Sequence, residues 1–165
     1  MNRTHGSIGT LPIECINPRY QKYRVRWDFQ PSYNETGEQD GVTFYEAEIT
    51  FPTMDKIKEV VLAGYNSLID ERILSGFVWN GIQVWLSTEN QFNYKAAYDL
   101  AVQTNGTTLP VRFKFGTTAE PVYYTFTSVE EFSSFYMSAI AYVNATLEQG
   151  WAEKDAIDWS IYNIE

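Results

Sequence analysis

The sequence predicts an α+β fold: three short antiparallel hairpins, each followed by a helix, in a single compact domain with an extended N-terminal arm. Apolar and polar residues alternate in paired short segments, as they do in half-buried strands, and then recur at helical spacing. An Asn-Gly dipeptide, typical of a tight turn, separates two of these segments. At 165 residues the chain can bury roughly 70% of its unfolded surface, so a core can form without disulfides or metals.

The first 21 residues show neither the alternation of a strand nor the spacing of a helix, and scattered glycines and prolines interrupt any regular element. We expect an irregular arm there, either a frayed terminus or a segment that orders on a neighbouring subunit. The predicted arm, α+β domain and C-terminal tail cover residues 1–21, 22–150 and 151–165.

A first hairpin is predicted over 23–29 and 43–51, where apolar and polar residues alternate strictly. One face carries opposite charges on the two segments, and an exposed pair of this kind contributes roughly 0.2–1 kcal/mol. These pairs would join Arg24 and Arg26 with Glu46 and Glu48. The inward face is expected to hold Tyr23, Val25, Trp27, Phe29, Tyr45, Ala47, Ile49 and Phe51.

The helix after this hairpin is predicted to run from Thr53 to Leu74, with Thr53 as N-cap. The hairpin that follows is the clearest local signal in the chain. Asn80-Gly81 can adopt the two positive φ values of a type I′ turn. The resulting register places four apolar side chains on one face, which the flanking helices should cover. These side chains are Phe77, Trp79, Ile82 and Val84.

A second helix is predicted over 89–103 and a third hairpin over 111–126. Thr127-Ser128 followed by Glu131 is typical of a capping box, and the helix behind it is expected to run to about Glu148 and to stop at Gly150. The apolar stripe of the second helix is expected at Phe92, Ala96 and Leu100, with Tyr94, Ala97 and Ala101 as candidates for further members of the same stripe.

No residue pattern points to catalysis, a cofactor or a metal, so we expect no enzyme. His5 is the single histidine and lies in the predicted arm, and Cys15 has no partner for a disulfide. Glycines do not form a phosphate-binding loop. The adjacent carboxylates Asp70-Glu71 and Glu130-Glu131 are explained by helix ends rather than by acid–base chemistry.

The formal charge of −9 argues against nucleic acid as a partner, because phosphate binding needs a basic patch. No apolar run approaches the length of a membrane span, and the polar start predicts no signal peptide. Aromatic residues make up 16% of the chain, and Tyr and Trp are enriched at interfaces. We therefore expect a homo-oligomer, with partner contacts through Tyr20, Tyr23, Trp151 and Trp159.

The segment 73–93, which contains Gly76-Phe77-Val78-Trp79-Asn80-Gly81, resembles a small domain of unknown function from bacteriophages and prophages, of a type found in Bacteroides-like hosts. Phe113-Lys114-Phe115, the helix start at 126–132 and the helix to Gln149 extend the resemblance over residues 68–157. That domain is often encoded among tail genes or lies at the C-terminus of tail-fibre-like proteins. Its usual histidine in the last helix is replaced here by Tyr142 or Asn144, so no role of that histidine carries over.

The resemblance implies a virion setting, with passage through the host cytoplasm during assembly. A non-enzymatic tail, baseplate or fibre component that binds other virion proteins comes first. A tail-fibre assembly chaperone is one alternative. A carbohydrate-binding module or glycan hydrolase is another, because exposed indoles among Trp79, Trp85, Trp151 and Trp159 could stack on sugars, with Trp151 and Trp159 as first candidates.

Overall fold

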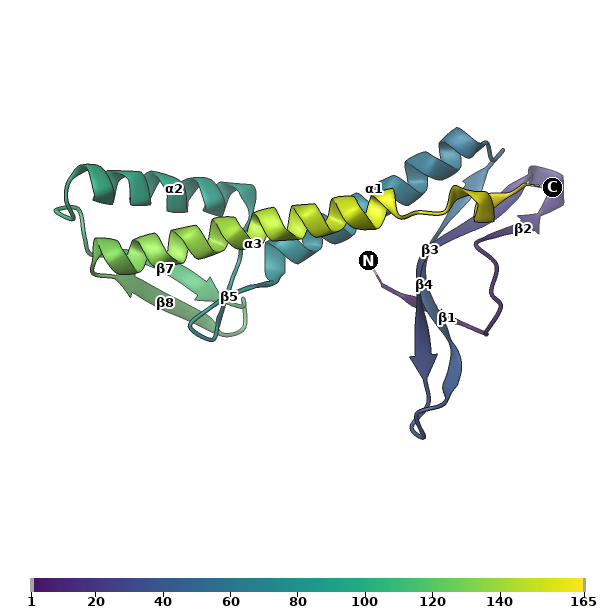
Figure 1. Ribbon diagram of the computed structural model, residues 1–165, viewed down its shortest axis with the longest axis horizontal. Coiled ribbons are helices and arrows are strands. Elements are labelled where there is room, and N and C mark those ends of the chain that lie inside the picture. The colour runs from purple at the N-terminus through teal and green to yellow at the C-terminus, as the bar shows by residue number, and fades with distance from the viewer. Residues whose placement is uncertain (1, 165) are drawn as a thin grey trace. The chain divides into compact units, whose positions relative to one another are not determined.

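The computed structural model describes residues 2–164 and confirms the α+β class, with antiparallel strand pairs and three α-helices in that part of the chain (Figure 1). Contacts between Cα atoms divide the chain into two compact units. Unit 1 comprises residues 1–68 and 153–165, and unit 2 comprises residues 69–152. The dividing positions fall within helices α1 (Met54–Ser75) and α3 (Val129–Asp155).

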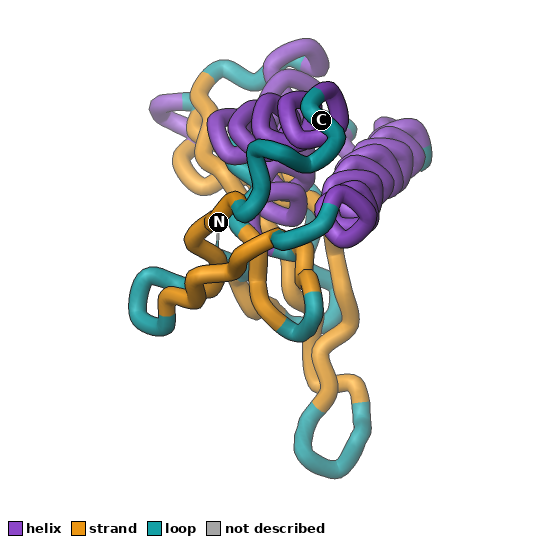
Figure 2. Tube along the Cα trace, turned by 90° about the vertical axis from the view of Figure 1, so that its left-hand side faces the viewer, coloured by secondary structure: helices purple, strands orange, loops and turns teal. Residues whose placement is uncertain are grey.

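Unit 1 is built on a four-stranded antiparallel sheet in the order β1-β4-β3-β2. Its centre is the predicted first hairpin, with long strands joined by a polar loop (Figure 2). The register sets Arg24 opposite Glu48 and Arg26 opposite Glu46, which confirms the predicted charge pairing. The strands are β1 (Thr4–Gly6), β2 (Ile13–Asn17), β3 (Lys22–Tyr33) and β4 (Gln39–Thr50).

The first 21 residues are not irregular, and that prediction is wrong. β1 pairs with β4 and β2 pairs with β3, so both edges of the sheet come from this segment. A short 3-10 helix, η1 (Pro18–Tyr20), connects β2 to β3. The two edge strands are only three and five residues long, too short to show a period. Both strands also pair within their own chain, rather than fraying or depending on a neighbouring subunit.

A bulge in β3 changes which residues face the core. The register shifts between Trp27 and Gln30, and Asp28 has a positive φ of 55°. Val25 and Trp27 are buried as expected, whereas the ring of Phe29 packs against Phe44, 5.3 Å between centroids. Strict alternation predicted Phe29 on the same face as Trp27, and the extra residue moves it to the other face.

The core of unit 1 lies between this sheet, the first half of α1 and the end of the chain. Ile57 and Val61 of α1 are fully buried with Trp27, and Gly64 lets the helix approach the indole, because a Cβ there would lie 2.4 Å from Trp27 Cζ2. Tyr162, in the 3-10 helix η2 (Trp159–Tyr162), donates a hydrogen bond from Oη to the carbonyl of Arg26 at 2.8 Å. The C-terminal segment is therefore part of this core.

Unit 2 contains the other two predicted hairpins. The Asn80-Gly81 turn has φ values of 49° and 78°, and Phe77 pairs with Val84 as predicted. Helix α2 (Thr88–Gln103), capped by Ser87, lies beside α3, and the third hairpin packs against α3 (Figure 1). The strands are β5 (Phe77–Trp79), β6 (Ile82–Val84), β7 (Val111–Gly116) and β8 (Pro121–Phe126).

The core of unit 2 is formed mainly by aromatic rings. Phe135 is fully buried on α3, and it packs edge-to-face on Tyr94 of α2 and stacks with Phe115 of β7. Phe126 of β8 stacks with Phe132 at 4.7 Å between centroids. This unit therefore uses much of the aromatic content of the chain for packing.

The apolar stripe predicted for α2 is wrong in its main members. Phe92 is 70% exposed and Leu100 is 50% exposed, whereas Tyr94 and Ala101 are buried. Helical spacing fits either face of this helix, and only the tertiary structure shows which one meets the core.

Gly150 does not end the last helix, which continues to Asp155. A Cβ at Gly150 would lie 2.3 Å from Cδ1 of Ile69 in α1. The glycine therefore serves close packing of α3 against α1 within unit 2, and not the helix end that the sequence predicted.

Candidate functional site

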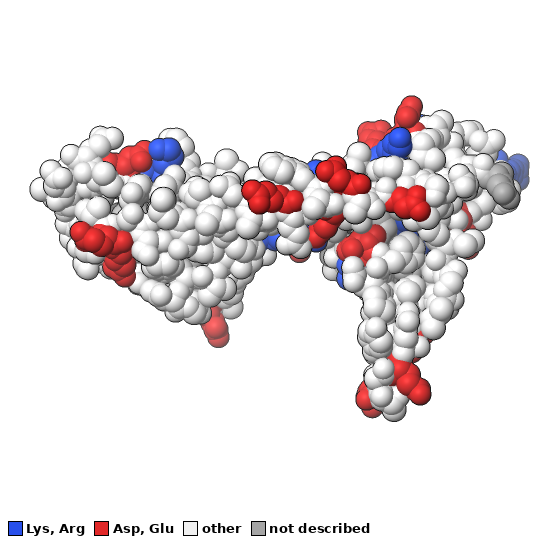
Figure 3. Space-filling model, viewed as in Figure 1, with Lys and Arg blue, Asp and Glu red and all other residues white. Residues whose placement is uncertain are grey.

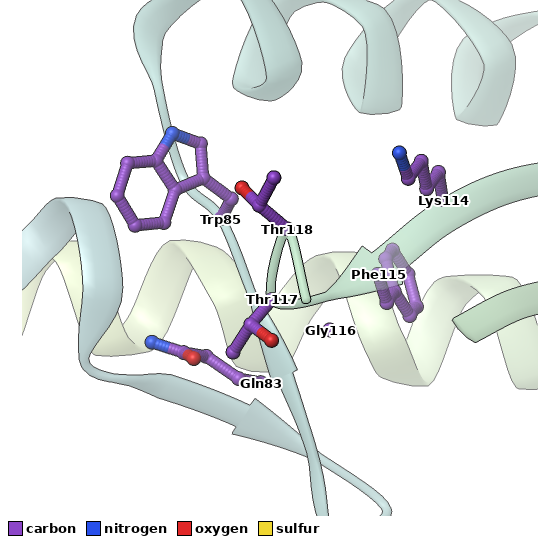
Figure 4. Close-up of a pocket in the computed structure, with 7 residues that line it drawn as sticks. All are labelled: Gln83, Trp85, Lys114, Phe115, Gly116, Thr117 and Thr118. Carbon is purple, nitrogen blue, oxygen red and sulfur yellow. The ribbon is translucent and has the colours of Figure 1, made fainter. Parts of the chain in front are cut away.

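A surface pocket of about 440 Å³ in unit 2 is the best candidate for a binding site. It lies between the segment that leads from β6 into α2 and the loop that joins β7 to β8 (Figure 4). Trp85 stands on one side of it, Lys114 on another, and two threonines of the loop lie between them (Figure 4). Its lining residues are Gln83, Trp85, Lys114, Phe115, Gly116, Thr117 and Thr118.

The backbone around this pocket is fixed by local hydrogen bonds. Asn90 Nδ2 donates to the carbonyl of Trp85 at 2.8 Å, and Gln83 Nε2 donates to the carbonyl of Ser75 at 2.7 Å. Thr117 Oγ1 accepts a hydrogen bond from the backbone N–H of Glu120 at 3.0 Å, which closes the β7–β8 loop. These bonds use Nε2 of Gln83 and Oγ1 of Thr117, and they leave Trp85, Lys114 and Thr118 without a side-chain hydrogen bond in residues 2–164.

The groups that face the pocket are free to bind a ligand. Within residues 2–164, no hydrogen bond or ion pair engages Lys114 Nζ or Thr118 Oγ1, and no ring contact engages the indole of Trp85, which is 46% exposed. Gln83 uses Nε2 on Ser75, and its carbonyl oxygen makes no hydrogen bond in the same part of the chain. The pocket thus offers an aromatic face, one ammonium group, a hydroxyl and an amide oxygen.

Charge is distributed unevenly around this site. On the face shown in Figure 3, acidic side chains outnumber Lys and Arg, and the basic ones form no continuous patch. Many basic side chains elsewhere are paired, including Lys95 with Asp99 at 2.5 Å. Lys114 is the one basic residue among those that line this pocket, and its ammonium group is a potential anion contact.

A second cluster of polar side chains, in unit 1, is structural. Arg26 Nη2 lies 2.6 Å from Glu14 Oε2, Nε lies 3.1 Å from Glu46 Oε2, and Nη1 donates to the carbonyl of Leu11 at 2.9 Å. The Arg26 side chain is only 7% exposed, and its guanidinium contacts Leu11 and Glu14 of the segment that precedes β3. The prediction of an exposed pair is wrong for Arg26.

The neighbouring ion pairs on this face are exposed, as predicted. Arg24 contacts Glu48 at 3.1 Å, and Lys22 also pairs with Glu48. Hydrogen bonds from Lys22 and Arg24 hold the pKa of Glu48 below its ordinary value, so this carboxylate stays ionised at neutral pH.

The four predicted partner-contact residues lie on four different elements. Tyr20 of η1 is 60% exposed and Trp151 of α3 is 54% exposed, so both are accessible. Tyr23 is half-buried in β3 and hydrogen-bonds with Cys15, which raises the pKa of its phenol. Trp159 is half-buried in η2 against Tyr162 and under Lys58. Their role in partner contacts stays a prediction.

Of the tryptophans considered for sugar stacking, the structure places Trp85 at a pocket. Trp151 and Trp159, the first candidates from the sequence, do not line this pocket. The sequence already indicated that Trp85 is accessible. The alternation in the Asn-Gly hairpin places Val84 inward, with Phe77, Trp79 and Ile82, and therefore the next residue, Trp85, outward.

The remaining sequence candidates form no site. His5 Nε2 lies 3.8 Å from Asp40 Oδ1 on the sheet, a contact that is an ion pair only when the imidazole is protonated. Residues 2–164 contain no group of three His, Cys, Asp or Glu side chains placed to hold a metal. In the same range no helix has the length and apolar character needed to cross a bilayer.

Comparison with known proteins identifies a family but no individual relative. No curated protein matches the chain, and no solved structure does. The model of one family, described as a domain of unknown function (DUF4376), matches residues 56–165, which include all of unit 2 and the candidate pocket. The match covers well over half of the sequence, and the chain therefore belongs to the DUF4376 family.

Proposed function

We propose that this protein is a non-enzymatic structural component of a bacteriophage virion, associated with the tail, baseplate or fibre, and that it acts by assembling with other virion proteins and with copies of itself. The resemblance of residues 68–157 to phage tail-region proteins supports the setting. Membership of a family of unknown function is compatible with it and adds no chemistry.

The observation that carries this proposal is the outer face of α2, which we define as Phe92, Ala96 and Leu100. These residues recur every four positions, and each is exposed. An isolated exposed apolar residue needs no explanation, but a stripe of them along one helix is typical of a surface that is covered in an assembly.

The oligomeric state tests the assembly part of the proposal. We expect the purified protein to be larger than a monomer by size-exclusion chromatography with light scattering. The double variant Phe92→Ser/Leu100→Ser should shift it towards monomer. The matched control is Val78→Ser/Tyr123→Ser, which replaces two similarly exposed residues on the hairpins of the same unit. A strict monomer at all concentrations would contradict the proposal.

Mass spectrometry of purified particles tests the virion part. We expect the protein in particles of the phage that encodes it, at a constant ratio to a known tail protein. A tail-fibre assembly chaperone is the alternative, and it would be abundant in infected cells but absent from particles.

A carbohydrate-binding function is the third candidate. It is favoured by one specific observation, the unpaired and half-exposed indole of Trp85 at the wall of the 440 Å³ pocket.

A further inference from the structure

We propose that the pocket lined by Trp85 and Lys114 binds an acidic saccharide, a sugar that carries a carboxylate. The inference rests on the third candidate function above and adds the chemical class of the ligand. It does not depend on whether the protein is part of a virion.

The aromatic wall suits the face of a sugar ring. The face of an indole is electron-rich, and it attracts the positively polarised C–H groups on one side of a pyranose. The ring of Trp85 is available for this, because it is 46% exposed and packs on no other ring in residues 2–164. The backbone that carries it is held by Asn90 and by the hydrogen bond from Leu86 N to the carbonyl of Leu74 at 3.0 Å.

The polar groups suit hydroxyls. Sugar hydroxyls both donate and accept hydrogen bonds, and they need partners of both kinds. Thr118 Oγ1 can do either, and its hydroxyl is turned towards the indole of Trp85 (Figure 4). The free carbonyl oxygen of Gln83, below Thr117 in Figure 4, is a further acceptor among the lining residues.

The charge of the pocket selects for an acid. Lys114 Nζ has no counter-ion within residues 2–164, and the same pocket has no carboxylate among its lining residues. A carboxylate on the sugar would form a charge-assisted hydrogen bond with this ammonium group, which is stronger than a bond between neutral groups.

Nucleotides fit the pocket less well. Phosphate groups are usually bound by helix N-termini, runs of backbone N–H groups or arginine forks, and the lining residues provide one lysine instead. The volume of about 440 Å³ lies within the range of small-molecule sites, roughly 300–1,000 Å³.

The test follows the indole N–H signals of the five tryptophans in ¹H–¹⁵N spectra of the full chain. D-galacturonic acid and N-acetylneuraminic acid are the acidic probes, D-galactose is the neutral probe, and adenosine monophosphate is the anionic control. We expect the acidic sugars to shift the Trp85 signal, identified with Trp85→Phe, and to bind more tightly than galactose. Rising salt should weaken only the acidic sugars.

Four variants locate the site. Trp85→Ala should abolish binding, and Lys114→Gln should weaken the acidic sugars about tenfold and leave galactose unchanged. The matched controls are Trp151→Ala, which removes a similarly exposed indole outside the pocket, and Lys95→Gln on the far side of α2 from the core. Both should bind as the unmodified chain does.

The outcomes separate the ligand class from the function. Binding of galactose as tight as that of the acids would overturn the acidic assignment and keep the carbohydrate function. Binding of the nucleotide alone, loss of binding in Trp151→Ala, or no shift of the Trp85 signal with any sugar would overturn both.

Discussion

The environment of Arg26 shows how a single side chain can join parts of the sequence that lie far apart. Its guanidinium contacts Glu14 of β2, Glu46 of β4 and the carbonyl of Leu11. Tyr162 donates a hydrogen bond to the backbone carbonyl of Arg26. From the sequence, Arg26 and Arg24 look alike, since both alternate outward from the same strand. The contacts of Arg26 with Leu11 and Glu14 depend on the first 21 residues, whose structure no periodicity predicted.

Replacing Arg26 should therefore cost more stability than replacing Arg24. We expect Arg26→Ala to lower the free energy of unfolding by about 2–3 kcal/mol, because it leaves the Leu11 carbonyl and a carboxylate without their partner. Arg24→Ala is the matched control and should cost less than about 1 kcal/mol, as exposed pairs do. Urea unfolding followed by circular dichroism measures both, and equal losses would show that Arg26 is not buried as described.

Tyr94 predicts a change of stability at alkaline pH. Burial raises the pKa of its phenol from 10 to about 12, because the ionised form is disfavoured inside the core. A folded-state pKa above the unfolded one contributes stability that is complete below about pH 10 and is lost as the pH rises towards 12. Tyr94→Phe cannot ionise, so its free energy of unfolding should fall less between pH 10 and 12.

Urea midpoints measured at intervals across this range check the expectation. Tyr123→Phe, at an exposed tyrosine of β8, is the control and should follow the unmodified protein. The same alkaline loss in Tyr94→Phe would show that Tyr94 contributes nothing to it.

At the scale of elements, the sequence predicts best what is local. The Asn-Gly hairpin is correct in turn, register and inward face, because positive φ at two adjacent residues fixes the pairing of their neighbours. The capping serine at 128 is also correct, since its hydroxyl accepts the N–H of Glu131 at 3.2 Å. The carboxylate of Glu131 instead accepts a hydrogen bond from Tyr124 at 2.6 Å, a contact that depends on the third hairpin.

The core-facing side of helix α2 cannot be predicted from local sequence. The choice between its two apolar faces is made by Tyr94, which packs on Phe113, Phe115 and Phe135 from two other elements. The candidate pocket could not be predicted from local sequence either, because Trp85 and Lys114 belong to segments that only the tertiary structure brings together.

A pair of alanine variants measures which face of α2 meets the core. Tyr94→Ala should lower the free energy of unfolding by about 3–4 kcal/mol, because it removes a buried ring. Phe92→Ala should change it by less than about 1 kcal/mol, because Phe92 is 70% exposed. Differential scanning calorimetry at protein concentrations too low for self-association checks the pair. A larger loss in Phe92→Ala than in Tyr94→Ala would show that the face with Phe92 meets the core.

At the scale of the whole molecule, the charge of −9 opposes assembly of identical copies. The outer face of α2 is flanked by Lys95 and Asp99, which pair with each other, so association through its apolar residues would compete with the repulsion between copies. Salt acts on only one of the two effects, because it screens the repulsion and leaves the apolar burial intact.

Self-association should therefore strengthen as ionic strength rises. We expect the dissociation constant from sedimentation velocity to fall between low and moderate salt at pH 7, and to fall also as the pH approaches the isoelectric point near 4.6. The Phe92→Ser/Leu100→Ser variant is the control and should show little of either trend. Weaker association at higher salt would indicate an interface made of ion pairs.

The placement of β1 and β2 has a consequence for the integrity of the chain. Both outermost strands of the sheet belong to the first 17 residues, where β1 pairs with residues 42–44 of β4 and β2 pairs with residues 22–25 of β3. A protease that removed this segment would expose the backbone donors and acceptors of both inner strands at these paired positions. Exposed strand edges can pair with a strand of another polypeptide. A preparation cleaved in this segment should therefore aggregate before the helices of unit 2 unfold.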